Sequence, residues 1–210
     1  MDGLLPLQPH DLLWGLPVAD LPVDAPAWVV DVVRLGHPVV VRRAQVLDGL
    51  VAVGVRGRSR DERYATVLKC ADIVKQIKPE QLVDGRVKHG NDWPALHALR
   101  QIRPVMNVLG LPWGVAGSVG FELASDVPVL HQDSDMDLIL RTDWFFSRQQ
   151  AAELVEALQG AACRIDLQLQ TPAGAVALRE WAGRAQKVLL KADDGARLVD
   201  NPWQLQECTI

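Results

Sequence analysis

The chain has 210 residues, and at about 100–200 residues per domain this length fits one large domain or two small ones and excludes a long multidomain array. Apolar residues make up 49% and charged residues 23%, a composition typical of a folded chain and not of intrinsic disorder. The 22 Lys and Arg residues are outnumbered by 26 Asp and Glu, so the net charge of -4 argues against a protein whose whole surface binds nucleic acid.

The N-terminus and the cysteines bear on where the protein works. The start, Met-Asp-Gly-Leu-Leu-Pro, lacks the positive segment and the small-residue cleavage site of a secretory signal. The longest uncharged run, residues 104–121, contains prolines and glycines that favour buried strands and turns over a membrane span. Cys70, Cys163 and Cys208 are odd in number and far apart, which fits neither a disulfide framework nor a four-ligand zinc site. We therefore expect a cytoplasmic protein with no membrane partner.

Residues 28–63 are predicted to form strands, because the runs 38–43 and 51–57 are rich in valine and interrupted by glycine. The polar, glycine-bearing stretch 84–90 is the best candidate for a domain boundary. We therefore predict a small β-rich N-terminal domain over residues 1–85. It is locally basic, with a net charge of +4 over residues 34–63, where three acidic residues accompany seven arginines: Arg34, Arg42, Arg43, Arg56, Arg58, Arg60 and Arg63.

Helices and strands are predicted to alternate after the boundary. Asp92 is expected to cap a helix whose early Pro94 costs no hydrogen bond, and apolar residues recur at helical spacing until Pro104 disturbs the helix end. A short strand near residues 113–116 then leads into a turn at residues 117–118.

The last third of the chain continues this alternation. Ser147 and Gln150 match the capping-box pattern and predict the start of a helix. Residues 163–171 alternate in polarity and predict a strand, and Thr171-Pro172 resembles a further helix start. Residues 188–199 predict a hairpin around an Asp-Gly turn.

Residues 134–141 alternate acidic and apolar side chains and predict a strand with one carboxylate-bearing face. Asp135 and Asp137 lie two residues apart, so both would project from that face and could share a hard, oxygen-seeking cation such as Mg²⁺. Asp166, in the strand predicted over residues 163–171, could close the site from a neighbouring strand.

Gly117 and Ser118 add a candidate phosphate site. A glycine lets the backbone approach a phosphate closely, and the Ser118 hydroxyl with the amides of a following helix start could bind phosphate oxygens. Together with the aspartates, these residues indicate metal-assisted phosphoryl or nucleotidyl transfer. The alternative is structural, because acidic residues that alternate with apolar ones also form the solvated face of an edge strand.

The order of these features resembles the superfamily of polymerase-β-like nucleotidyltransferases. Its pattern is a Gly-Ser turn, a Ser-Asp-x-Asp-Leu strand at residues 134–138, a helix, and a strand with a central Asp. The resemblance implies that Asp135 and Asp137 bind a metal, Mg²⁺ or Mn²⁺ in its place, and that Asp166 assists. It also implies an α+β fold in which a nucleotidyltransferase domain over residues 86–210 follows the N-terminal domain.

A closer resemblance spans nearly the whole chain. The segments 10–14, 38–43, 53–57 followed by Arg60, and 188–191, with the motifs above, are similar to malonate decarboxylase holo-acyl-carrier-protein synthases. This family is also called phosphoribosyl-dephospho-CoA transferase.

The resemblance implies a reaction and its partners. A serine hydroxyl of the apo acyl-carrier subunit of malonate decarboxylase attacks the α-phosphorus of triphosphoribosyl-dephospho-CoA and releases pyrophosphate. Asp135 and Asp137 then hold the metal, Asp166 is a ligand or the general base, and Gly117 and Ser118 hold the leaving phosphates. The N-terminal arginines would meet the triphosphate or an acidic carrier protein, from across a cleft between the two domains.

Two other functions remain open at this point. One is a general nucleotidyltransferase that uses a nucleoside triphosphate on a small molecule or on nucleic acid, although the acidic chain weighs against nucleic acid. The other is a non-catalytic adaptor that binds the carrier protein through its arginines. Metal-dependent release of pyrophosphate would exclude the adaptor.

Overall fold

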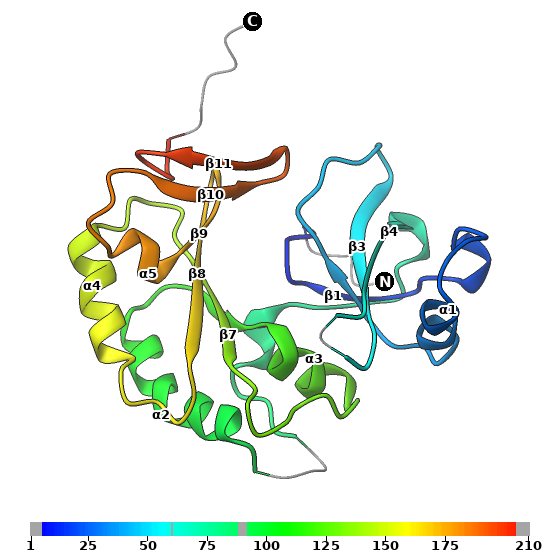
Figure 1. Cartoon of the computed structure of the whole chain (residues 1–210), viewed down its shortest axis with the longest axis horizontal. Helices are drawn as coiled ribbons and strands as arrows, with labels where there is room; N and C mark the ends of the chain where they lie inside the picture. Colours follow the sequence, from blue (N-terminus) through cyan, green and yellow to red (C-terminus); the bar gives the residue numbers. More distant parts are fainter. Residues whose placement is uncertain (1–5, 60, 88–91, 205–210) are drawn as a thin grey trace, which may run out of the picture.

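The computed structural model describes residues 6–59, 61–87 and 92–204, which form two β-sheets that lie side by side (Figure 1). The strands of the first sheet lie between residues 12 and 77, and those of the second between residues 113 and 199. Helices accompany both sheets, so the prediction of a mixed α+β fold is confirmed. Within the described ranges, no helix is both long and apolar enough to cross a membrane.

The N-terminal sheet has five antiparallel strands in the order β4-β3-β2-β1-β5. The helix α1 packs on one face of this sheet, where Val29 and Val33 join alternate valines of the strands in a buried core. The opposite face is turned toward the second sheet. The bounds are β1 Leu12–Trp14, α1 Ala27–Arg34, β2 Val39–Val41, β3 Leu50–Arg56, β4 Arg63–Lys69 and β5 Lys75–Ile77, with 3-10 turns η1 Val18–Asp20, η2 Cys70–Asp72 and η3 Pro79–Leu82.

The prediction of strand from residue 28 is wrong for residues 28–34, which belong to α1. Four valines in this stretch favour strand by propensity, but propensity is a weak signal compared with burial. Val29 and Val33 lie one helical turn apart and are both buried, and Pro26 stands at the N-cap, where its missing N–H costs nothing.

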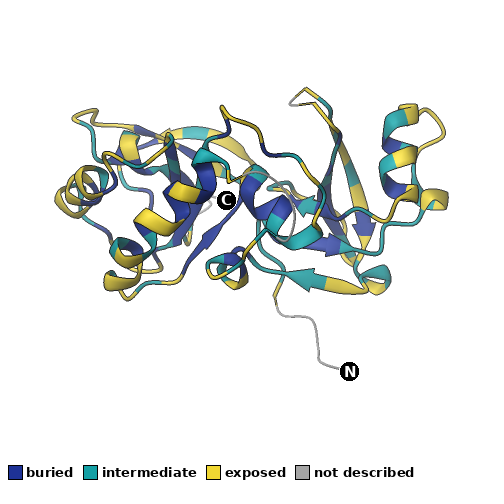
Figure 2. Cartoon of the chain, turned by 90° about the horizontal axis from the view of Figure 1, so that it is seen from below, coloured by how far each residue is buried: buried dark blue, intermediate teal, exposed yellow. Residues whose placement is uncertain are grey.

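The second sheet has six strands in the order β11-β10-β9-β8-β7-β6. Only β7 and β8 run parallel, and the helix α4 connects them. Figure 2 shows that the buried residues concentrate in the strands and on the inner sides of the helices. The bounds are α2 Pro94–Val108, β6 Trp113–Val115, α3 Gly117–Ser125, β7 Met136–Arg141, α4 Arg148–Ala157, β8 Ile165–Thr171, β9 Gly174–Ala177, α5 Leu178–Trp181, β10 Val188–Ala192 and β11 Gly195–Val199.

Alternation along β7 and β8 decides which side chains meet the helices. Leu138, Leu140, Leu167 and Leu169 point into the large core that includes apolar residues of α2 and α4. The residues that alternate with the core residues, Asp137 and Asp166 among others, therefore lie on the opposite face of the sheet. This face is the one available to the N-terminal sheet.

Two predicted helix starts are wrong. The cap of α2 is Trp93, with Pro94 as first helical residue, while Asp92 instead pairs with Arg100 and His97. Pro104 lies inside α2, which continues to Val108.

The second error is at Thr171, where the chain makes a tight hairpin and not a helix. Thr171 pairs with Gly174 across the turn, and the Thr171 hydroxyl donates to the carbonyl oxygens of Gly174 and Pro202. Two local predictions are confirmed: the Ser147–Gln150 capping box begins α4, and β10 and β11 form a hairpin.

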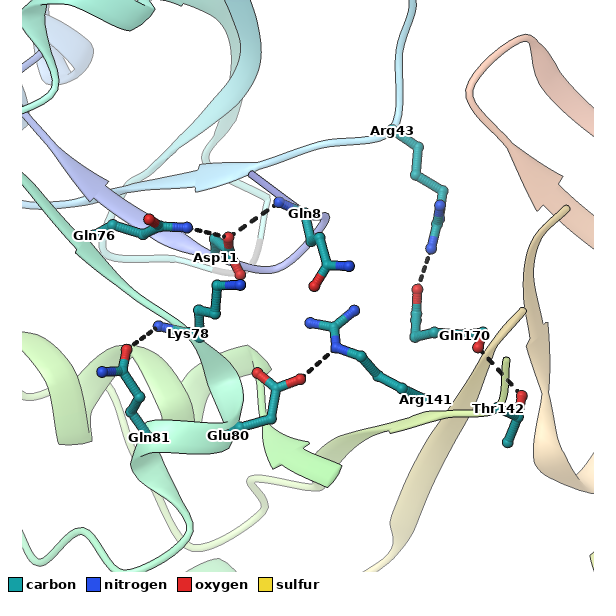
Figure 3. A network of polar contacts seen from close by, with 10 residues as sticks. All are labelled: Gln8, Asp11, Arg43, Gln76, Lys78, Glu80, Gln81, Arg141, Thr142 and Gln170. Carbon is teal, nitrogen blue, oxygen red and sulfur yellow. Dashed lines mark hydrogen bonds and ion pairs between the residues drawn. The ribbon is translucent and has the colours of Figure 1, made fainter. Parts of the chain in front are cut away.

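The two sheets are joined by shared packing and by a polar network (Figure 3). In β1, Leu13 is buried in the N-terminal core, while its neighbour Leu12 is buried in the core of the second sheet. Arg43 donates to the side-chain oxygen of Gln170, and Arg141 forms an ion pair with Glu80. Each unit thus contributes side chains to the other, and this fixes the faces that oppose one another.

Candidate active site

A cavity of about 610 Å³ opens between the two sheets. Its lining includes residues of β1 to β4 on one side and of the start of α3 and β7 on the other. All five residues predicted for the site line this cavity: Gly117, Ser118, Asp135, Asp137 and Asp166.

Asp137 and Asp166 are directly paired across the parallel strands β7 and β8. Neighbouring strands lie about 4.8 Å apart, and directly paired residues project from the same face of the sheet. The two carboxylates are therefore neighbours on the cavity side. Their position follows from sequence alternation, since Leu138 and Leu167 occupy the core side.

Asp135 does not lie on the strand as predicted, because β7 begins at Met136. A turn places it instead. The Ser134 hydroxyl oxygen accepts a 3.0 Å hydrogen bond from the backbone N–H of His131, and the buried carboxylate of Glu122 accepts backbone N–H groups of residues 129 and 130 at 2.7 and 2.8 Å. These hydrogen bonds to Ser134 and Glu122 hold the turn, and Asp135 lines the same cavity as Asp137.

Gly117 lies against the Asp137 carboxylate. It has a φ of 58°, and a Cβ placed on it would lie 1.8 Å from an Asp137 carboxylate oxygen. Ala116 N–H also donates to the Asp137 carbonyl oxygen at 2.9 Å. The predicted turn at residues 117–118 is in fact the first part of α3, whose first backbone N–H groups have no intrahelical acceptor, and both residues line the cavity.

We expect Gly117→Ala to lower both stability and activity. The left-handed backbone costs a non-glycine residue about 1–2 kcal/mol, and the added methyl group forces the Asp137 carboxylate to move. The control is Gly36→Ala, because Gly36 also has a positive φ, of 70°, but nothing lies within 4 Å of its added Cβ. Urea unfolding should show the backbone cost in both variants and a further loss in Gly117→Ala from the contact with Asp137, and only Gly117→Ala should lose turnover. Equal turnover in the two variants would contradict this role of Gly117.

Arg56 is the site residue that sequence reasoning did not single out. It ends β3 in the N-terminal sheet, and its guanidinium donates a 2.7 Å hydrogen bond to the Ser118 hydroxyl oxygen of α3. The guanidinium carbon also lies 5.4 Å from the centre of the Phe121 ring. Arg56 thus connects the two walls of the cavity at the predicted phosphate site.

The electrostatics around Arg56 are those of a half-buried cation. Burial lowers its pKa to about 10, with a further lowering from Arg63, while Asp137 and Glu122 oppose the shift. The group therefore stays charged at neutral pH. Its buried Nε–H has no hydrogen-bond partner within the described part of the chain. A buried donor of this kind is costly to leave unpaired.

The other N-terminal arginines divide into two groups. Arg42, Arg58 and Arg63 line the cavity, and all three are exposed. Arg34 lies on α1, where it pairs with Asp31, and Arg43 reaches Gln170. Arg60 lies outside the described residues.

The chain matches known families over almost all of its length. Residues 8–79 match the phosphoribosyl-dephospho-CoA transferase MdcG N-terminal domain, and residues 81–202 match the phosphoribosyl-dephospho-CoA transferase MdcG C-terminal domain. The chain belongs to the phosphoribosyl-dephospho-CoA transferase family. The suspected family resemblance is thereby confirmed, and the chain is an enzyme, so the non-catalytic adaptor is excluded.

Individual relatives support this assignment. A phosphoribosyl-dephospho-CoA transferase of Pseudomonas syringae pv. tomato is 57% identical over 99% of this chain and 98% of its own length. Proteins of the same name from Pseudomonas aeruginosa and Azotobacter vinelandii are each 50% identical, over 95% and 96% of this chain and the same shares of their own. No solved structure matches the chain.

The donor set of the site fits a hard divalent cation. Asp135, Asp137 and Asp166 offer carboxylate oxygens to one cavity. Among the residues with described positions, no group of three or more His, Cys, Asp or Glu side chains is arranged to hold a metal ion by itself. Mg²⁺ in phosphoryl-transfer sites is commonly bound by one or two carboxylates and completed by substrate phosphates and water, so a two-carboxylate site agrees with both observations.

His10 is a second residue of the cavity that the sequence did not reveal. Its backbone has a φ of 76°, uncommon for a residue other than glycine. Burial is the main cause that lowers its pKa to about 4, and Arg43, Arg141 and Lys191 act in the same direction. The imidazole is therefore neutral at pH 7, so the cavity has an uncharged polar group at this point.

Stability should depend on pH through His10. Because its folded pKa lies below the ordinary value of 6.5, its contribution is complete above pH 6.5 and is lost as the pH falls toward 4. The loss amounts to about 3 kcal/mol. We expect urea unfolding to show this extra loss between about pH 7.5 and pH 4 in the wild type and not in His10→Asn, since asparagine also tolerates a positive φ. Parallel pH profiles of the two proteins would contradict it.

Proposed function

We propose that this enzyme transfers the phosphoribosyl-dephospho-CoA group from triphosphoribosyl-dephospho-CoA to a serine of the apo acyl-carrier subunit of malonate decarboxylase. The observation that carries the proposal is the pairing of opposite charges in one cavity. Asp135, Asp137 and Asp166 stand on one wall, while Arg56 reaches Ser118 from the other. A triphosphate bound with a cation needs both kinds of group.

The carboxylates are assigned to the cation. Asp135 and Asp137 would hold Mg²⁺, or Mn²⁺ in its place, and the cation when bound neutralises charge that develops on the phosphates. Asp166, paired with Asp137 across the strands, serves as a further ligand or as the base for the incoming hydroxyl. We assign these roles on the geometry of the wall and on the family resemblance.

The opposite end of the triphosphate is assigned to Arg56 and the start of α3. The Arg56 guanidinium and the Ser118 hydroxyl lie in hydrogen-bond contact and offer donors to phosphate oxygens. Gly117 keeps the backbone close to the Asp137 carboxylate, so the cation ligands and the phosphate donors are held a short distance apart. The arrangement orients the donor for in-line displacement.

The proposed transfer is a displacement at the α-phosphorus of the donor. The serine oxygen of the carrier forms a bond to the α-phosphorus, and the bond from that phosphorus to the bridging oxygen of the β-phosphate breaks. The hydroxyl proton passes to the base, and the electron pair of the broken bond leaves with pyrophosphate. The charge that develops on the leaving group lies next to Arg56, which stabilises it.

Pyrophosphate release distinguishes this function from the alternative nucleotidyltransferase. With Mg²⁺, the triphosphoribosyl donor and apo carrier subunit, the wild type should release one pyrophosphate per carrier. ATP in place of the donor should release none above background. Release with ATP, with or without the carrier, would instead favour a general nucleotidyltransferase that acts on another acceptor.

A further inference from the structure

The cavity-facing side of the N-terminal sheet carries a row of small and apolar residues. Leu12 pairs with Val40, Val40 with Gly54, and Gly54 with Ala65, so the four residues lie in register across β1, β2, β3 and β4. All four line the cavity. We call them the sheet platform.

The sheet platform is long enough for a purine ring. Leu12 is buried in the core of the second sheet, so Val40, Gly54 and Ala65 form its open part, and at about 4.8 Å between strands these three residues extend over about 10 Å. Gly54 has no side chain and Ala65 only a methyl group, and Ala65 is exposed. The Arg42 side chain lies over Gly54, since a Cβ added there would be 3.2 Å from the Arg42 Cδ. The platform thus offers an apolar surface with a guanidinium-bearing side chain lying across it.

The chemistry of the cavity changes from one region to another. The aspartates, Ser118 and, at the end of β3, Arg56 offer charge and hydrogen bonds, whereas the four residues of the sheet platform offer no charged side chain. His10, next but one to Leu12, adds a polar imidazole at one end. A ligand that joins a polyanion to a flat aromatic ring matches both regions, because rings pack on apolar surfaces and stack with guanidinium groups.

We propose that the sheet platform binds the adenosine of the donor, with the adenine ring against Ala65 and stacked on Arg42. This inference rests on the proposed function, which supplies a donor with a triphosphate and an adenosine separated by one ribose. The platform then selects the dephospho-CoA part, and the carboxylate wall the reactive phosphates. The platform thereby contributes to specificity, while the carboxylates, Ser118 and Arg56 hold the reacting phosphates.

Ala65 provides the test, because a large side chain there blocks the platform without touching the charged wall. Ala65→Trp and the smaller Ala65→Leu are compared with Ala196→Trp. Ala196 is likewise an exposed alanine of an edge strand, β11, and does not line the cavity. Isothermal titration measures the affinity of the full chain for two probes, 3′-dephospho-CoA and tripolyphosphate with Mg²⁺.

We expect Ala65→Trp to weaken dephospho-CoA binding by at least about tenfold, the size of effect that base stacking produces, and Ala65→Leu to act in the same direction. Ala196→Trp should bind like the wild type, and tripolyphosphate affinity should stay within about twofold in all variants, less than 0.5 kcal/mol. Wild-type affinity for dephospho-CoA in both Ala65 variants, or equal loss of both probes, would overturn the inference, as would a wild type that does not bind dephospho-CoA.

The outcome is separable from that of the proposed function. A wild type that binds dephospho-CoA on the platform but releases no pyrophosphate contradicts the proposed function alone. If the wild type releases pyrophosphate but the Ala65 variants bind dephospho-CoA as tightly as the wild type, only the platform is contradicted.

Discussion

Replacing Asp137 with Asn should lower the rate of group transfer by about a hundredfold or more, the loss expected when a group that stabilises transition-state charge is removed. The amide keeps the volume of the side chain, so the contact with Gly117 is preserved while the charge is lost. The free energy of unfolding should change by no more than about 1 kcal/mol. The measurement is pyrophosphate release at saturating donor and limiting Mg²⁺.

Asp143→Asn is the matched control, because Asp143 is an exposed aspartate just beyond the other end of β7 and does not line the cavity. It should turn over like the wild type. Near wild-type turnover of Asp137→Asn, in protein whose unfolding is unchanged, would contradict the assignment of the carboxylate wall.

Replacing Arg56 with Met should weaken donor binding by about tenfold to a hundredfold, because a hydrogen bond to a charged group contributes about 1.5–3 kcal/mol. Methionine retains an apolar stem against Phe121 but removes the donors to Ser118 and to the phosphates. The loss should persist as ionic strength rises, since contacts inside a cavity are screened less than those at the surface. The measurement is KM for the donor at low and high salt.

Arg34→Met serves as the control for Arg56, because Arg34 is exposed on α1 and its contact is with Asp31. Its KM should equal that of the wild type. If Arg56→Met raised KM for the carrier and left KM for the donor unchanged, Arg56 would belong to partner recognition, and the triphosphate would need another cationic partner.

The features that the sequence predicts well are those with short-range causes. Asp137 and Asp166 each alternate with leucines, and period-two alternation alone places them opposite the core. The capping box at Ser147 and the hairpin at β10 and β11 likewise depend on neighbours within a few residues. These local patterns place Asp137 and Asp166 on the cavity face, whereas the expectation that they serve a metal site comes from the family resemblance.

What escaped prediction depends on tertiary contacts. The bond from Arg56 to Ser118 joins residues 62 apart, and nothing in the sequence near Arg56 separates it from the six other arginines. Arg56 lies two residues after Gly54 and therefore on the same face of the strand. This spacing predicts that Arg56 reaches the cavity once it is known which face of the sheet lines the cavity. The position of Asp135 likewise depends on a contact between elements. The Glu122 carboxylate, in α3, accepts the backbone N–H groups of residues 129 and 130 and so holds the turn that precedes Asp135.

Propensity misled where burial decides. The valines of α1 favour a strand by propensity. Two of them, however, lie one helical turn apart and pack together on the sheet. At Thr171 the proline that resembled a helix start sits in a two-residue hairpin turn instead. In both places the neighbouring sheet provides the partner that fixes the conformation, and the partner is distant in sequence.

The most direct measurement of the central claim is the intact mass of the carrier. Apo acyl-carrier subunit incubated with the enzyme, Mg²⁺ and triphosphoribosyl-dephospho-CoA should gain one phosphoribosyl-dephospho-CoA group, linked to a serine. Asp137→Asn should leave most of the carrier unmodified over the same time, and a carrier whose acceptor serine is replaced by alanine should gain nothing. An unchanged carrier mass with the wild-type enzyme, or equal modification by Asp137→Asn, would contradict the account.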